Sequence, residues 1–277
     1  MNAKQLYNYL EHDFRLSACD DDWEGMDMNE YITAQYRSRY MGLVTDNTDV
    51  INYVYTAVFP SQAVIEKITT ENALLFVHHP MKWDITKNPV FTDIPIETLK
   101  SLKERKVSIY NLHAPLDTNG PYSTTVNFAE ALGINVTDEF YEYHKVNVGI
   151  IGTIDCQNIK QRFENAVGHE VKVYQYGDDT IKNNKVALVA GGGNDAAVYP
   201  YLRKLGINTF LTGVAGMRDD YRPSADAHDA AKENGVNILA GTHYSTEKFA
   251  CMKMAEYFSR HGISGEFIPD SPCMEDL

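Results

Sequence analysis

Short runs of apolar residues alternate with amphipathic stretches along most of the chain. Runs typical of buried β-strands occupy residues 54–59, 73–77, 107–112, 146–151, 185–190, 209–212 and 236–240. Patterns typical of helices lie between them, at residues 61–69, 96–105, 124–132, 159–167, 194–205, 225–234 and 246–260. Strands that alternate with helices favour an α/β fold in which most strands are parallel.

Local signals at the ends of these runs agree with the helix boundaries. Ser61 is a residue type that caps helix N-termini, and Gly133, Gly206 and Gly235 follow predicted helices as C-terminal caps do. Residues 20–50 show no regular pattern. We place a domain boundary near residues 125–145, although no linker rich in Pro, Gly and Ser marks it.

Composition and charge narrow the class of protein. The 277 residues suggest about two domains. A net charge of -13 disfavours binding to nucleic acid or anionic lipid, because polyanions are repelled at long range. No window approaches the ~20 apolar residues that span a membrane. Cys19, Cys156, Cys251 and Cys273 form no CxxC pair, so we predict reduced thiols in a cytoplasmic protein.

Residue types that bind metals follow three of the predicted strands. The set comprises His78, His79, His113, Asp117, His243 and Glu247. In open α/β sheets, ligands bind outside the carboxyl ends of the strands, so three such ends could converge on one crevice. We therefore predict a two-metal site built from His78, His79, Asp117, His243 and Glu247.

The chemistry of these side chains narrows the choice of metal. Imidazole and carboxylate without thiolate suit Zn, Fe, Mn, Co or Ni. Five side chains are too few for two closed four-coordinate sites unless a carboxylate is shared, and water would fill the remaining positions. Open positions are typical of catalytic metals.

The residues of each segment can also be explained without a bound metal. Adjacent histidines such as His78 and His79 occur by chance on surfaces, and Asp117 precedes a sequence typical of turns. Glu247 lies in a first helical turn, where the helix dipole favours a carboxylate. The equivalent placement of all three segments after strands favours the metal site.

Other polar residues allow more than one interpretation. His113 is a candidate general base or a partner that holds a ligand in place, and a role outside the site is equally compatible. The glycines at 191–193 favour a tight strand-to-helix turn over a phosphate site, because no P-loop lysine follows. His228 could approach the site. Surface positions are predicted for His12, His144, His169 and His261.

With these segments, the sequence resembles the Nif-three-like dinuclear metal-centre proteins, a family that includes GTP cyclohydrolase I type 2 homologues. The resemblance is carried by residues 75–80, 113–117 and 241–247, and residues 186–193 and 211–213 are similar to the family's middle segments. It runs from about Gly42 to the last helix. The three ligand segments are jointly specific in their order and spacing.

The resemblance implies two similar α/β domains, one from residues 1–125 together with 236–277 and the other from residues 126–235. It also implies a ring-shaped homo-hexamer with two divalent ions per chain. His79 and Asp117 would serve one ion, His78 and His243 the other, and Glu247 would bridge them.

The resemblance also bears on function. It implies a metal-dependent hydrolase that acts on a small molecule, a nucleotide such as GTP or a related heterocycle. A non-enzymatic, metal-bearing regulatory or metal-handling oligomer is the alternative, and the same ligands would serve it. The family commonly has Thr-Gly-Glu where this chain has Thr212-Gly213-Val214, and an acidic residue is missing after the first strand. These departures leave the predicted ligands intact and concern the substrate.

Overall fold

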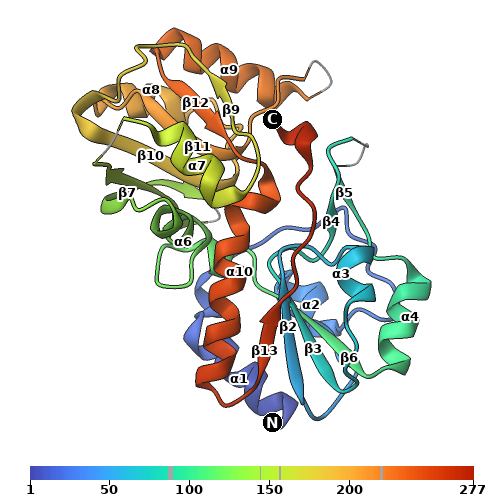
Figure 1. Cartoon of the computed structure of the whole chain (residues 1–277). Helices are drawn as coiled ribbons and strands as arrows, with labels where there is room; N and C mark the ends of the chain where they lie inside the picture. The colour runs from blue at the N-terminus through green and yellow to red at the C-terminus, as the bar shows by residue number, and fades with distance from the viewer. Residues whose placement is uncertain (87–89, 144, 156, 219–220) are drawn as a thin grey trace. The chain divides into compact units, whose positions relative to one another are not determined.

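The computed structural model describes the whole chain except residues 87–89, 144, 156 and 219–220. Its internal contacts group the residues into two compact units, each with its own sheet (Figure 1). Unit 1 comprises residues 1–118, 144–146 and 250–271, and unit 2 comprises residues 119–143, 147–249 and 272–277. Compactness alone does not define a folding domain, so the predicted domain boundaries stay a prediction.

Unit 1 is built on a five-stranded sheet with the strand order β1-β6-β3-β2-β13. The strands are β1 (Gly42–Thr45), β2 (Tyr53–Ala57), β3 (Ala73–Val77), β6 (Val107–Asn111) and β13 (Gly265–Phe267). All neighbours are parallel except β1 and β6. The helices are α1 (Ala3–Asp13), α2 (Ala34–Arg39), α3 (Gln62–Glu66), α4 (Ile96–Glu104) and α5 (Ala114–Asp117). A small hairpin joins β4 (Lys82–Trp83) to β5 (Phe91–Thr92).

Unit 2 is built on a six-stranded sheet with the order β7-β8-β10-β11-β12-β9. Its parallel centre consists of β10 (Lys185–Gly192), β11 (Thr209–Val214) and β12 (Asn237–Ala240). The flanking strands are β7 (Asn135–Tyr143), β8 (Val146–Thr153) and β9 (Lys172–Tyr174), and the helices are α6 (Thr124–Ala131), α7 (Ile159–Val167), α8 (Val198–Lys204) and α9 (Arg222–Asn234). Helix α10 (His243–Arg260) begins in unit 2 and ends among the residues of unit 1.

Each unit buries a separate apolar core. In unit 1, Leu99 and Leu102 of α4 are buried and pack with Leu75 and Ile109 of the sheet. In unit 2, Phe128 and Phe163 pack from α6 and α7 against the sheet. At about 25 cal/mol per Å² of apolar surface removed from water, such burial is the main term that favours both sheets.

The predicted fold class is confirmed: the protein is α/β, and most neighbouring strands in its sheets are parallel. The predicted boundaries of β3 and α7 match the structure, and the Ser61 hydroxyl accepts the Val64 N–H as the expected cap. Within the described part of the chain, no helix is long and apolar enough to cross a membrane. Cys19, Cys251 and Cys273 form no disulfide, and Cys156 lies outside the described residues.

Two elements differ from their predictions for local reasons. Helix α8 begins at Val198 rather than near residue 194, because the Asp195 carboxylate accepts the Ala197 N–H and the Tyr141 hydroxyl and so holds a turn there. Strand β7 was not predicted, since nearly all its residues are exposed and it lacks an apolar run. The unassigned residues 20–50 contain α2 and β1.

Candidate metal centre

The parallel pairing of β3 with β6 positions the candidate ligands of unit 1. Val77 pairs with Asn111, so both strands end at the same edge of the sheet. His78 and His79 follow β3 directly, and their N–H groups donate to the carbonyls of Ala57 (3.2 Å) and Val58 (2.9 Å). Both histidines lie in a bend directly beyond the strand, and the centroids of their two imidazole rings are 4.3 Å apart.

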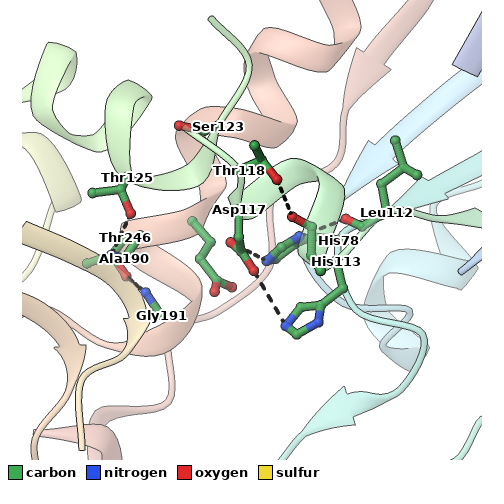
Figure 2. A network of polar contacts seen from close by, with 12 residues as sticks. His78, Leu112, His113, Asp117, Thr118, Ser123, Thr125, Ala190, Gly191 and Thr246 are labelled. Atoms are coloured by element: carbon green, nitrogen blue, oxygen red, sulfur yellow. Dashed lines mark hydrogen bonds and ion pairs between the residues drawn. The ribbon is translucent and has the colours of Figure 1, made fainter. Parts of the chain in front are cut away.

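His78 is fully buried and held at both its backbone and its ring. Its Nδ1 lies 2.9 Å from the carbonyl oxygen of Leu112, so Nδ1 carries the proton and donates it. This tautomer leaves the lone pair on Nε2, which lies 3.5 Å from Asp117 Oδ1 (Figure 2). Metal-binding histidines show the same arrangement, in which a carbonyl holds one ring nitrogen and the other faces the ion.

His79 is 2% exposed and lies among aromatic rings. Phe59 stacks on its imidazole at a centroid distance of 4.9 Å, while Trp23 and Phe91 lie 5.9 and 5.4 Å away. Aromatic side chains therefore shield this ring from bulk water. A neutral imidazole is the form that binds metal ions.

Asp117 ends the short helix α5 and faces two imidazoles. Its Oδ1 lies 3.5 Å from His78 Nε2, and its Oδ2 lies 3.6 Å from His113 Nε2 (Figure 2). Both distances exceed ordinary hydrogen-bond lengths. The carboxylate is buried at 8% residue exposure, a position that carboxylates rarely occupy without paired charges or bound metal.

His113 lies between two carboxylates, and one of them was missed from the sequence. Its Nδ1 is 2.9 Å from Asp21 Oδ1, and Asp21 also accepts the Ala114 N–H at 3.2 Å. Burial lowers the pKa of His113, but the charges of Asp21 and Asp117 outweigh that effect and raise it. Burial alone would raise the pKa of Asp21. The charge and hydrogen bond of His113 outweigh burial, so the pKa of Asp21 is lowered. The only signal in the sequence was the acidic run at 20–22.

Three imidazoles of unit 1 form a group that fits a metal ion. Ring nitrogens of His78, His79 and His113 lie within 4.8 Å of one another, and the Asp117 carboxylate faces two of these rings. Buried imidazole and carboxylate are the donors that first-row divalent ions prefer. The side chains present therefore fit the implied metal, and His113 belongs to this group as well as the predicted His78 and His79.

In unit 2, His243 and Glu247 lie one turn apart at the start of α10. His243 Nε2 is 3.1 Å from Glu247 Oε1, and both residues are buried. The helix begins at His243, three residues before its predicted start, and the preceding Thr242 has a φ of +66°. A β-branched residue in that conformation costs of order 1–3 kcal/mol and is found where function or packing demands it.

The glycine run at the end of β10 makes a close contact with the ligand pair through Gly191. Gly191 has a φ of +74°, and a Cβ at this position would lie 2.1 Å from Glu247 Oε1. The Gly191 N–H donates to the Thr246 hydroxyl at 2.9 Å (Figure 2). The run ends β10 and leads into a loop, so the prediction of a tight strand-to-helix turn is wrong.

The remaining histidines differ in their environments. His12 is exposed as predicted, whereas His169 is half-buried and its Nε2 lies 2.8 Å from the Ser245 hydroxyl. His228 is buried, with Nε2 2.6 Å from the Ala215 carbonyl and Nδ1 2.8 Å from the Tyr176 hydroxyl. Both ring nitrogens of His228 therefore have hydrogen-bond partners within unit 2. His144 lies outside the described residues.

The five predicted ligands thus fall into two groups. His78, His79 and Asp117 gather in unit 1, and His243 and Glu247 in unit 2. Their union in one dinuclear centre stays a prediction.

Comparisons with known proteins agree with this fold. The family model of Duf34/NIF3 (NGG1p interacting factor 3) matches residues 30–269. A GTP cyclohydrolase 1 type 2 homolog from Pyrococcus horikoshii is 29% identical, over 83% of this chain and 89% of the relative. The homolog from Borreliella burgdorferi is 27% identical, over 78% and 82%.

Solved structures show the same fold. Protein ybgI, of unknown function, superposes with a TM-score of 0.75 at 20% identity, covering 99% of this chain and 100% of its own. Reduced HcgD from Methanocaldococcus jannaschii gives a TM-score of 0.68 at 23% identity, with 98% of each chain covered.

The contact between Gly191 and Glu247 leads to a stability prediction. Gly191→Ala should destabilise the protein by at least ~1–2 kcal/mol, since an L-residue is strained at this φ and the methyl group meets the carboxylate. The free energy of unfolding is measured by circular dichroism in urea. The neighbouring Gly192→Ala is the matched control, because its Cβ would meet nothing within 4 Å. Equal stability of the two variants would contradict the proposed close contact.

Proposed function

The chain belongs to the Duf34/NIF3 (NGG1p interacting factor 3) family, and we propose that it binds two divalent metal ions and acts as a metal-dependent hydrolase. The substrate class that we propose is a nucleotide or a related phosphorylated heterocycle, because relatives are named GTP cyclohydrolase 1 type 2 homologs. The single observation that supports the metal most strongly is the His78 ring, held by a carbonyl at Nδ1 with Nε2 facing a buried carboxylate.

We assign the ligands as the residue chemistry and the family resemblance suggest. His79 and Asp117 would hold one ion, His78 and His243 the other, and Glu247 would be shared. The i,i+4 spacing of His243 and Glu247 supports this, since it brings one imidazole and one carboxylate to the same face of α10. His113 contacts Asp21 through its Nδ1, so its Nε2 is the ring nitrogen that faces Asp117.

The proposed roles of the chain's own groups follow from their placement. The bound ions would act as Lewis acids and lower the pKa of a coordinated water. With Nε2 protonated, His113 would hold the Asp117 carboxylate in place. General-base action, which requires the same nitrogen to be unprotonated, is the alternative role that we propose. Because the chain carries a net charge of -13, recognition of an anionic nucleotide would depend on local positive charge such as the ions provide.

A metal-bearing protein without turnover is the second candidate. The burial of His78 and His79, at 0% and 2% exposure, supports it, because a deeply buried ion is well retained and poorly reached by substrate. The two candidates share their ligands and differ only in whether a substrate is converted.

Metal content provides the first test. Protein purified without a histidine tag or added metal should contain two divalent ions per chain by elemental analysis. Glu247→Ala should lower occupancy at both positions, because a shared carboxylate serves both ions. Glu256→Ala is the control, since it removes the same charge from an exposed position on the same helix. Full occupancy in the Glu247→Ala protein would exclude the bridging role.

Turnover provides the second test. Assays with nucleotides and phosphoesters in the presence of defined metals should detect hydrolysis that His78→Ala and His79→Ala reduce by 100-fold or more, roughly the loss expected when a ligand is removed. His12→Ala, at an exposed ring, should leave the rate unchanged. If metal-loaded protein converts none of these substrates, the non-enzymatic candidate is favoured.

Assembly provides a third test. We propose a homo-hexamer in the cytoplasm, whose closed symmetry would satisfy every interface. A charge of -13 per chain opposes association, so apolar or complementary interfaces must dominate. Light scattering should give a particle near six times the chain mass of 31.3 kDa, weakly dependent on salt. A monomer over a wide concentration range would refute the assembly.

A further inference from the structure

The last residues of unit 2 form a segment that the family comparison does not include. The family model matches residues 30–269, and the short 3-10 helix η3 (Met274–Asp276) lies beyond that range. Within this segment Asp276 is fully buried, at 0% exposure, whereas its neighbour Glu275 is exposed. A carboxylate is seldom buried completely unless it is paired or hydrogen-bonded.

Asp276 joins two segments that are distant in sequence. Its carboxylate Oδ2 accepts the backbone N–H of His243 at 2.8 Å. Its carbonyl oxygen accepts the N–H groups of Ala215 at 2.9 Å and Gly216 at 2.8 Å. The approach at Gly216 is close, since a Cβ there would lie 2.9 Å from the Glu275 carbonyl. One residue therefore ties the loop after β11 to the first turn of α10.

The bond to His243 fills a gap in the capping of α10. The first N–H groups of a helix have no partner inside it, and a nearby side chain normally accepts one of them. Thr242 accepts the Ser245 N–H at 3.2 Å, and its left-handed backbone leads into the helix. The His243 N–H is then taken by Asp276 from 33 residues away, and a carboxylate at that end is favoured by the helix dipole.

Other contacts restrain the same helical turn at neighbouring positions, whereas Asp276 restrains His243 itself. The Thr246 hydroxyl accepts the Gly191 N–H, and the Ser245 hydroxyl lies 2.8 Å from His169 Nε2. These contacts hold positions 245 and 246. Asp276 holds position 243 itself, from which the imidazole reaches Glu247 at 3.1 Å.

We infer that Asp276 is a positioning residue for the metal ligands of α10: by binding the His243 N–H, it fixes the backbone from which the His243 imidazole and its partner Glu247 are presented. The inference rests on the proposed metal-binding function. It predicts that loss of the carboxylate weakens metal binding more than a general loss of stability would.

The test measures Co²⁺ binding to the full chain by its visible absorption, which reports both affinity and ligand geometry. Asp276→Ala should raise the dissociation constant about 10- to 100-fold, the usual effect of losing a group that orients a ligand, and should change the spectrum. Asp276→Asn keeps an acceptor for the N–H and loses the charge, so a rise of about two- to fivefold is expected. Glu275→Ala, which removes the same charge from the adjacent exposed residue, should bind as the wild type does.

The outcomes separate this inference from the function on which it rests. Failure of the wild type to bind Co²⁺ would overturn the metal centre and the inference together. Wild-type binding with an unchanged dissociation constant and spectrum in Asp276→Ala would overturn the inference alone. If Asp276→Ala does not fold, Asp276→Asn decides, and a wild-type dissociation constant and spectrum in that protein would refute the positioning role.

Discussion

The parallel register between β3 and β6 is the constraint on which the donor group of unit 1 depends. It pairs Val77 with Asn111, so the residues that follow both strands emerge at one edge of the sheet. All residues of both strands are buried, and the register is therefore specified by the core on both faces. A slip of one residue would exchange the faces of every side chain and separate His78 from the Leu112 carbonyl that sets its tautomer.

Buried titratable groups in both units are stabilised by hydrogen bonds to other protein groups. Three of the candidate histidines are each held by a protein group through a hydrogen bond. Leu112 holds the His78 ring, Asp21 holds the ring of His113, and Asp276 holds the backbone of His243. Burying several imidazoles and carboxylates is costly without such partners, and the cost falls further when a cation neutralises the carboxylates. Burial of these side chains is therefore less costly when a metal ion is bound than when the site holds no cation.

Unusual backbone conformations gather around the first turn of α10. Thr242 and Gly191 both have a positive φ. Because Gly191 has no side chain, the Glu247 carboxylate can occupy the space that a Cβ would fill. Strained or close-packed backbone persists only where the surroundings over-determine it, and it is common at functional sites. The first glycine of the Gly-Gly-Gly run is thus explained by its close approach to the candidate ligand Glu247, whereas a Cβ at Gly193 would meet Thr212.

Local sequence patterns are sufficient to predict the α/β class, the bounds of β3 and α7, and the residue types that follow the strands. Those features depend on local periodicity and on residue chemistry, which a linear pattern records. Three features depend on long-range contacts: the start of α8 at Val198, the exposed strand β7, and the support of His113 and His243 by Asp21 and Asp276. Asp21 is 92 residues from His113, and Asp276 is 33 residues from His243. A hydrogen bond across such a separation depends on how the chain folds back on itself, and no local pattern of apolar and polar residues encodes which acidic residue will be the one that is buried.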